Sequence, residues 1–386
     1  MVFDRFALAV MPSNRLLIAL ALSLSMLGLV MVTSASLQIA ETRLGSPFHF
    51  AMRHGVFLMA ALVVASLTYL VIPTALLHRL RHLALLAATA ALVLVLLPGI
   101  GREVNGSQRW ISLAGFNMQP SEFAKLGFIV YLAGYIAEHR EALETSWDAF
   151  LKPLAILGGL TLLLLMEPDF GAVVVLGMAA MGMLFLSGVP TLRFLLVGLV
   201  AVILAAVVAM AQPYRVARLM SFVDPWQDQF GGGYQLTQSL IAFGRGGIDG
   251  VGLGNSVQKL FYLPEAHTDF VFAVTAEEFG LLGTLLVLGL FAALCLQIFR
   301  IGGDLLARGD VFRGQLVIGI GFVIATQAFI NMGVNMGLLP TKGLTLPFVS
   351  YGGSSLLVSA IMLGLVLRAE TEGRATVPSE RTRRRP

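Results

Sequence analysis

The sequence predicts an all-α, multi-pass membrane protein of about ten transmembrane helices. Two observations support this prediction: apolar residues make up 57% of the 386-residue chain, and charged residues make up only 12%. A soluble domain averages about 25% charged residues, and the apolar surplus here is too large for one soluble core. The apolar runs are long and unbroken rather than alternating, which favours helices over the strands of a membrane barrel.

Each predicted helix is a run of about 20 mostly apolar residues, the length that crosses the hydrocarbon core. The first run is uncharged from Leu16 to Ala40, which is longer than the apolar core of a signal peptide. We therefore expect a retained first helix. The ten predicted spans are 15–36, 52–73, 81–98, 121–137, 152–167, 170–188, 192–211, 269–299, 312–337 and 347–368.

The distribution of basic residues predicts how these spans are oriented. With the N-terminus in the cytoplasm, 16 of the 26 Lys and Arg residues fall in cytoplasmic segments, as the positive-inside rule requires. Both ends are then cytoplasmic: an N-terminal tail of residues 1–14 and a basic, disordered tail of residues 369–386 flank a membrane domain of residues 15–368. The longest external (periplasmic) loop, 212–268, lies between the seventh and eighth spans.

Unusual polar side chains collect in three external segments. The first is Gly101–Ile111 with Gln119–Lys125, the second is Leu263–Phe270 followed by Glu277 and Glu278, and the third is Leu339–Pro347 with Ser350–Ser355. These segments resemble the signature stretches of the FtsW/RodA family, also called SEDS proteins. The resemblance covers nearly the whole chain, with all three segments in the same order. Met166–Gly171 and Thr341–Pro347 resemble the cell-division branch of the family more than the elongation branch.

The resemblance implies a multi-pass protein of the bacterial inner (cytoplasmic) membrane that works at the division septum. The family polymerises lipid II, a disaccharide-peptide joined through pyrophosphate to a polyprenyl chain. The acceptor 4-hydroxyl attacks the anomeric carbon of the donor, and polyprenyl pyrophosphate leaves. Such a peptidoglycan glycosyltransferase needs a base for the hydroxyl proton, cations for the leaving group and an apolar groove for the polyprenyl chain.

By resemblance, the essential acid of the family falls on Asp269, so we expect this residue to be the catalytic base. By position alone, Asp269 could equally cap the eighth helix. Glu265 shares a helical face with Asp269 if the helix begins early, and then tunes it or binds a divalent cation; otherwise it is a solvated loop acid. His267 either orients the base or is an ordinary hydrogen-bonded loop histidine.

The expected contacts to pyrophosphate are cationic. Arg102, Arg109 and Lys342 match basic positions of the family segments, and the alternative for each is pairing with a nearby acid. Glu122 and Lys125 lie three residues apart on one helix face; they either pair with each other or contact substrate. Mg²⁺ or Mn²⁺ is compatible with pyrophosphate chemistry, with Asp269 and Glu265 as candidate ligands, but no cluster in the sequence identifies a metal site.

Further polar residues lie inside the predicted spans. Gln327, Asn331 and Asn335 form one stripe of the ninth span and either hydrogen-bond to neighbouring helices or line the path of the polyprenyl pyrophosphate. Ser350 supports the third external segment. Glu277 and Glu278 face different directions, and we expect at least one of them to be a structural ion pair or hydrogen-bond anchor.

Two other functions remain compatible with the sequence: a transporter that flips lipid II across the membrane, and a scaffold without activity that recruits other division proteins. Asp269 at the outer interface favours the enzyme. The resemblance implies a class B penicillin-binding protein, the division transpeptidase, and other divisome proteins as partners, besides membrane lipid. We expect no nucleic-acid partner. The glycines of Gly250–Gly254 resemble a nucleotide loop only faintly, because no strand precedes them.

Overall fold

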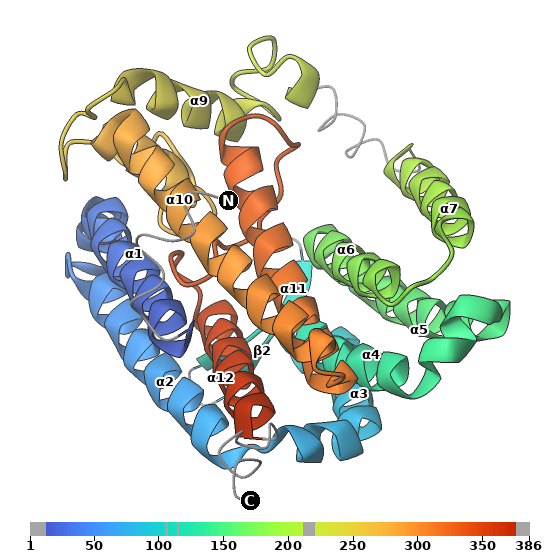
Figure 1. Ribbon diagram of the computed structural model, residues 1–386. Helices are drawn as coiled ribbons and strands as arrows, with labels where there is room; N and C mark the ends of the chain where they lie inside the picture. Colours follow the sequence, from blue (N-terminus) through green and yellow to red (C-terminus); the bar gives the residue numbers. More distant parts are fainter. Residues whose placement is uncertain (1–12, 105–106, 114–115, 211–220, 376–386) are drawn as a thin grey trace, which may run out of the picture.

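Ten long helices form the body of the computed structural model, which describes residues 13–104, 107–113, 116–210 and 221–375 (Figure 1). They are α1 (Ser13–Leu44), α2 (His49–Val71), α3 (Thr74–Leu96), α4 (Pro120–Thr145), α5 (Trp147–Met166), α6 (Phe170–Leu186), α7 (Thr191–Met210), α10 (Val271–Ala307), α11 (Val311–Asn335) and α12 (Gly353–Ala375). Among the described residues, seven helices are long and apolar enough to cross a membrane, and α6 and α7 add shorter apolar helices. The predicted multi-pass helical membrane fold is confirmed.

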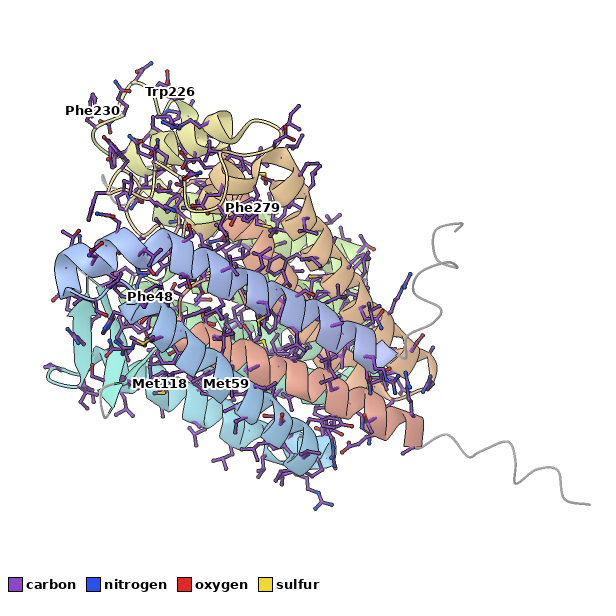
Figure 2. All side chains as sticks on the ribbon, turned by 90° about the vertical axis from the view of Figure 1, so that its left-hand side faces the viewer. Phe48, Met59, Met118, Trp226, Phe230 and Phe279 are labelled. Atoms are coloured by element: carbon purple, nitrogen blue, oxygen red, sulfur yellow. The ribbon has the colours of Figure 1, made fainter. Side chains whose placement is uncertain are left out.

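The helices divide into a buried centre and a lipid-facing periphery. α11 and α12 are the most enclosed spans, and α4 packs against α11, α6 and α3. α2 and α7 leave large apolar side chains exposed, among them Met59, which is 64% exposed and lies on the outer side of α2 in Figure 2. Exposed apolar surface of this extent is expected where lipid rather than water surrounds the helices. α7 lies at the edge of the bundle, in contact with α6 (Figure 1).

One element was not predicted. Within the segment 99–120 the chain forms a three-stranded antiparallel sheet from β1 (Gly101–Val104), β2 (Ser107–Leu113) and β3 (Phe116–Met118), in the order β1-β2-β3. Trp110 pairs with Arg102, and Ile111 pairs with both Gly101 and Met118. The sheet packs on α3 and α4. The end of the bundle that carries this sheet is called the sheet end below.

The long loop 212–268 carries a further helix, α9 (Tyr234–Gly246), which lies across the ends of α10 and α11 (Figure 1). The chain after α9 hydrogen-bonds to α10 at the point where this helix is interrupted. At Gly280 the backbone leaves the helical conformation, and the Glu277 and Glu278 carbonyls accept hydrogen bonds from Val251 (3.0 Å) and Gly252 (3.0 Å). Inside a membrane protein, backbone groups freed by such a break need partners of this kind.

The glycine-rich segment Gly250–Gly254 therefore serves backbone packing. A Cβ atom at Gly250 would lie 2.2 Å from the Glu278 carbonyl oxygen, so only glycine allows this approach. The described residues 221–268 of this loop therefore pack against the bundle, through α9 and through the segment that follows it.

Several helix ends differ from the prediction. α12 begins at Gly353 rather than at residue 347, and α3 begins at Thr74 rather than at residue 81. The segment 338–352 before α12 is irregular, with Phe348 at a positive φ of 64°, because this chain bends into the sheet end of the bundle. α12 continues to Ala375, past the predicted boundary at residue 368. Residues 1–12 and 376–386, which hold most of the two predicted tails, lie outside the described residues.

Candidate active site

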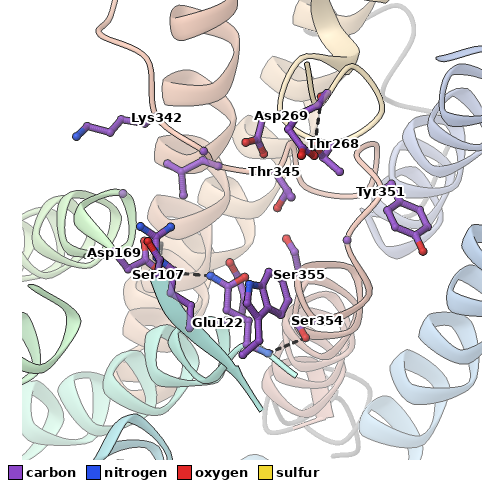
Figure 3. Close-up of a pocket in the computed structure, with 18 of the residues that line it drawn as sticks. Ser107, Glu122, Asp169, Thr268, Asp269, Lys342, Thr345, Tyr351, Ser354 and Ser355 are labelled. Carbon is purple, nitrogen blue, oxygen red and sulfur yellow. Dashed lines mark hydrogen bonds between the residues drawn. The ribbon is translucent and has the colours of Figure 1, made fainter. Parts of the chain in front are cut away.

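A cavity of about 1120 Å³ opens at the sheet end of the bundle. Its walls come from α2, the sheet, the starts of α4, α6 and α12, and the segments 265–270 and 340–345 (Figure 3). Six of the predicted site residues line it: Asp269, Glu265, His267, Arg109, Lys342 and Glu122. The cavity is therefore where segments far apart in the sequence converge, and it is referred to below as the main cavity.

Asp269 lies two residues before α10 and does not cap it. Phe270 occupies the N-cap position, and no side chain there bonds the first turn. The capping alternative is therefore wrong. The backbone carbonyl of Asp269 accepts hydrogen bonds from the Nδ2 atoms of Asn331 (2.8 Å) and Asn335 (3.0 Å). Within the described residues, no hydrogen bond or ion pair engages the Asp269 carboxylate, so the backbone is anchored while the acid faces the cavity (Figure 3).

The surroundings of Asp269 shift its proton affinity. Burial and, to a smaller extent, the negative charge of Glu265 raise the pKa of Asp269, Arg109 opposes both effects, and the resulting pKa is about 7. A general base works best with a pKa near the working pH, because it must be ionised and still hold the proton it receives. The environment of Asp269 meets this requirement.

The polar stripe of α11 anchors two loops. Besides holding Asp269, Asn331 donates to the Leu344 carbonyl (2.5 Å), and Gln327 Nε2 donates to the Thr345 carbonyl (3.0 Å). None of the three α11 side chains lines the main cavity. Gln327 also accepts from Lys125 of α4, so the geometry favours the hydrogen-bonding alternative, although most of the partners lie in loops rather than in helices.

Glu265 and His267 form one wall of the main cavity. Glu265 has a positive φ of 56°, and its carboxylate accepts a hydrogen bond from Thr268 Oγ1 (2.8 Å). The His267 ring packs between Phe50, at 4.8 Å between ring centroids, and Tyr351, at 5.6 Å. Burial lowers the pKa of His267, so its ring is neutral at pH 7 and acts as a packed wall.

Two of the three predicted phosphate-binding cations reach the main cavity. Arg109 on β2 donates from Nε to the Glu167 carbonyl (2.9 Å) and from Nη2 to the Pro168 carbonyl (2.5 Å). Lys342 lies with Nζ 4.5 Å from the centroid of the Phe170 ring. Arg102 is exposed on β1 and is not among the cavity residues.

Glu122 and Lys125 form the ion pair that their spacing allowed. Lys125 Nζ lies 2.9 Å from Glu122 Oε2 and donates to Gln327 Oε1 at 2.6 Å. Lys125 is only 1% exposed and does not line the cavity, whereas Glu122 does. A buried lysine that is already paired is poorly placed to bind substrate. Ser350 likewise acts locally, because its hydroxyl accepts a hydrogen bond from the Leu346 amide (2.8 Å).

Sequence reasoning missed an acid in the main cavity. Asp169 caps α6 by accepting from the Ala172 amide (3.2 Å), and its other oxygen accepts from Ser121 Oγ (2.8 Å) and Gln119 Nε2 (3.3 Å). The sequence signal was present: an acid followed directly by an apolar run marks a helix start. Its neighbour Glu167 is buried, which together with Asp169 raises the Glu167 pKa to about 8.

Arg53, Tyr351, Ser354 and Ser355 also line the main cavity and were not singled out from the sequence. Ser354 Oγ links the sheet to α12, because it accepts from the Gln119 amide (3.0 Å) and donates to the Asn117 carbonyl (3.2 Å). Their positions depend on the fold of segments distant in sequence, so no local pattern could have identified them.

Glu277 and Glu278 are both structural, which confirms the prediction for at least one. Glu277 accepts from the Val257 (3.1 Å) and Gln258 (3.2 Å) amides and pairs with Arg245 (3.2 Å). Glu278 accepts from Ser34 Oγ (2.7 Å) and Lys259 Nζ (2.6 Å). The two acids therefore fix the 245–259 loop and α1 to α10.

Among the described residues, no group of three or more His, Cys, Asp or Glu side chains is arranged to hold a metal ion. Asp269 and Glu265 face the same cavity, and two carboxylates hold Mg²⁺ only where water and substrate phosphates complete its coordination. We derive no step of the reaction through a metal.

The comparisons with known proteins agree with this architecture. The family model described as a cell cycle protein, FTSW_RODA_SPOVE, matches residues 14–375. A protein of Alcanivorax borkumensis named "Probable peptidoglycan glycosyltransferase FtsW" is 67% identical over 91% of this chain and 91% of its own length. A protein of Pseudomonas fluorescens with the same name is 52% identical over 94% of this chain and 89% of its own.

Solved structures show the same fold. One, described as "Structural coordination of polymerization and crosslinking by a peptidoglycan synthase complex", has a TM-score of 0.75 and 30% identity over 92% of this chain and 97% of that chain. The rod shape determining protein RodA of Thermus thermophilus has a TM-score of 0.65 and 30% identity over 92% of this chain and 96% of its own. The chain belongs to the FtsW/RodA/SpoVE family.

Proposed function

We propose that this chain is a peptidoglycan glycosyltransferase that polymerises lipid II during septal cell-wall synthesis, with Asp269 as the general base. The observation that supports it most directly is the Asp269 carboxylate, which faces a cavity that Arg109 and Lys342 also line, with its backbone anchored and its pKa raised to about 7. The names of the relatives that share most of this chain support the same activity.

In the proposed reaction, the acceptor sugar places its 4-hydroxyl against the Asp269 carboxylate. The carboxylate takes the hydroxyl proton while the oxygen bonds to the anomeric carbon of the donor. The bond from that carbon to the pyrophosphate breaks, and polyprenyl pyrophosphate leaves with the electron pair. Because attack and departure occur on opposite faces of the donor ring, the configuration at the anomeric carbon inverts.

The cations of the main cavity suit the leaving group. Arg109 uses its Nε and Nη2 donors on the carbonyls of residues 167 and 168, which fixes the guanidinium plane and leaves Nη1 for an anion. Lys342 lies on the neighbouring 340–345 segment and supplies a point charge. Charges held in place before the reaction stabilise the developing pyrophosphate charge without reorganisation.

We further propose that the sheet end faces the periplasm, with both termini in the cytoplasm of a cell whose inner membrane holds the chain. The description of the solved peptidoglycan synthase complex, which pairs polymerisation with crosslinking, supports a class B penicillin-binding protein as partner. We also propose recruitment to the septum with other divisome proteins, which the names of the FtsW relatives support.

The test is polymerisation of labelled lipid II by the purified chain with its transpeptidase partner, resolved on a gel. Asp269→Asn is expected to abolish polymer formation without loss of partner binding. Asp249→Asn, an exposed aspartate of the same 212–268 loop, is the matched control and is expected to polymerise normally. Polymer formed by the Asp269→Asn protein would remove this residue from the mechanism. A wild-type chain that leaves lipid II unpolymerised would overturn the proposed activity.

A further inference from the structure

A second cavity, of about 360 Å³, lies behind one wall of the main cavity. Phe50, Glu265 and His267 line both cavities, so the two cavities adjoin along these side chains. The second cavity is otherwise formed by α1 and by the segment 259–266. Asp269 does not line it, so its contents would meet the proposed base only across the shared wall.

The lining of the second cavity suits an apolar chain with an anionic head. Ala35 and Ile39 on α1 and Leu263 and Pro264 on the loop provide apolar surface. Arg43, in the last turn of α1, lines the cavity and is exposed, and among the described residues no ion pair engages it.

The second cation in this cavity, Lys259, is already neutralised. Its Nζ lies 2.6 Å from Glu278 Oε1 and 2.7 Å from Ser34 Oγ. Arg43 is therefore the residue that can contact an anion here, with the forked geometry that suits phosphate groups.

The loop wall of the second cavity is held in an unusual backbone conformation. Phe261 (φ 70°) and Glu265 (φ 56°) both line it, and both have a positive φ that non-glycine residues rarely adopt. The loop keeps this conformation because Glu277 and Glu278 anchor its base through Val257 and Lys259. Strained residues fixed by surrounding contacts cluster at ligand-binding sites.

The proposed reaction itself requires a second lipid site. Donor and acceptor each carry a polyprenyl pyrophosphate, and the attacking 4-hydroxyl lies at the far end of the acceptor disaccharide from its own pyrophosphate. When that hydroxyl is at Asp269, the acceptor pyrophosphate must lie two sugar rings away. It cannot occupy the place beside Arg109 and Lys342, where the donor pyrophosphate departs.

We propose that the second cavity binds the lipid pyrophosphate of the acceptor, with Arg43 contacting the phosphates. The acceptor sugars then pass alongside Glu265 and His267, where the two cavities adjoin, to reach Asp269. The polyprenyl chain follows the outer face of α1, where Met26 is 58% exposed. This assignment rests on the proposed function, because it divides two substrates of one reaction between two cavities.

The kinetic test separates the two substrates. A lipid II analogue without the 4-hydroxyl serves only as donor, and an analogue with a methylene group between sugar and pyrophosphate serves only as acceptor. Arg43→Ala is expected to raise the acceptor KM roughly tenfold, since a charged hydrogen bond is lost, with donor KM and kcat unchanged. Arg43→Lys is expected to recover most of the affinity. Arg308→Ala, an exposed arginine after α10, is the control and should change neither KM.

A rise in donor KM, or an unchanged acceptor KM, would overturn the assignment while leaving the polymerase activity intact.

A binding experiment tests the cavity without turnover. A photoreactive polyprenyl pyrophosphate is expected to label peptides of α1 and of 259–267, and Arg43→Ala should remove this label while sparing labels on 340–345. An uncharged polyprenol probe and excess inorganic pyrophosphate separate recognition of the chain from recognition of the head group. No label on α1 or 259–267 would refute the site, and label without polymerisation by the wild type would refute only the proposed function.

Discussion

Asp269 and Glu278 lie within one stretch of chain, yet the protein treats the two carboxylates in opposite ways. Asp269 is held by its backbone carbonyl, through Asn331 and Asn335, and its side chain faces the main cavity. Glu278 is 1% exposed, and its side chain is occupied by Ser34 and Lys259. Asp269 is available for chemistry because its hydrogen bonds are made by the backbone, whereas the carboxylate of Glu278 is already bonded.

The strongest test of this contrast is Asp269→Asn. We expect polymerisation to fall by about two to four orders of magnitude, since a positioned base contributes roughly 10²–10⁴-fold. The folded-state pKa of about 7 exceeds the ordinary aspartate value of 3.8, so Asp269 lowers stability as pH rises between these two values, and the full cost is present above pH 7. The variant should therefore be at least as thermostable as the wild type at pH 8, measured in detergent. A large fall in melting temperature would assign Asp269 a structural role.

Glu278→Ala should have the opposite profile. It leaves Lys259 buried without its acid, and breaking a buried pair costs about 3–5 kcal/mol. We expect a clear loss of thermal stability, with kcat per folded molecule at saturating lipid II largely kept. The double variant Glu278→Ala with Lys259→Met is the control, because it removes both charges and should regain stability. Loss of turnover in a stable Glu278 variant would contradict the comparison.

Lys342→Ala probes the cations of the main cavity. We expect turnover to fall roughly tenfold, because one charged contact to the leaving pyrophosphate is lost. Initial rates over a range of lipid II concentrations measure it, with Lys342→Arg as the variant that keeps the charge. Unchanged kinetics would exclude a role for Lys342 in the departure of pyrophosphate.

The pH profile gives a smaller effect with a defined sign. The base must be ionised, so the rate should rise with pH and reach half its maximum near the Asp269 pKa of about 7. Glu265→Gln removes a negative charge that raises this pKa, so its midpoint should move to lower pH. A midpoint that Glu265→Gln shifts upward, or leaves in place, would show that the two acids do not interact as the structure indicates.

Arg102→Ala should have the smallest effect. The residue is exposed on β1 outside the main cavity, although its sequence position suggested a phosphate contact. Polymerisation rates within about twofold of wild type are expected, since substitutions of exposed residues are usually nearly neutral. A tenfold loss would mean that substrate reaches beyond the main cavity and over β1.

The number and order of the long helices could be predicted from the sequence because apolar runs record the membrane environment locally. Asp269, Arg109 and Lys342 could be selected because they lie in segments that resemble a known family. The sheet of 101–118 could not be predicted, since its strands are short and are stabilised by packing on α3 and α4. Whether Arg102 and Lys125 contact substrate could not be predicted either, because it depends on which residues the fold places next to them.

The sequence by itself determined that this chain is a membrane bundle of its family, with an acidic segment before the eighth span. Only the tertiary structure decided which charged side chains are paired with other residues and which face a cavity. Lys259 meets Ser34 and Glu278, and Lys125 meets Gln327, across large separations in sequence. The physical reason is that the hydrophobicity of a segment alone determines whether it enters the membrane. A buried charge, in contrast, needs a polar partner, and here the folded chain supplies that partner from a distant part of the sequence.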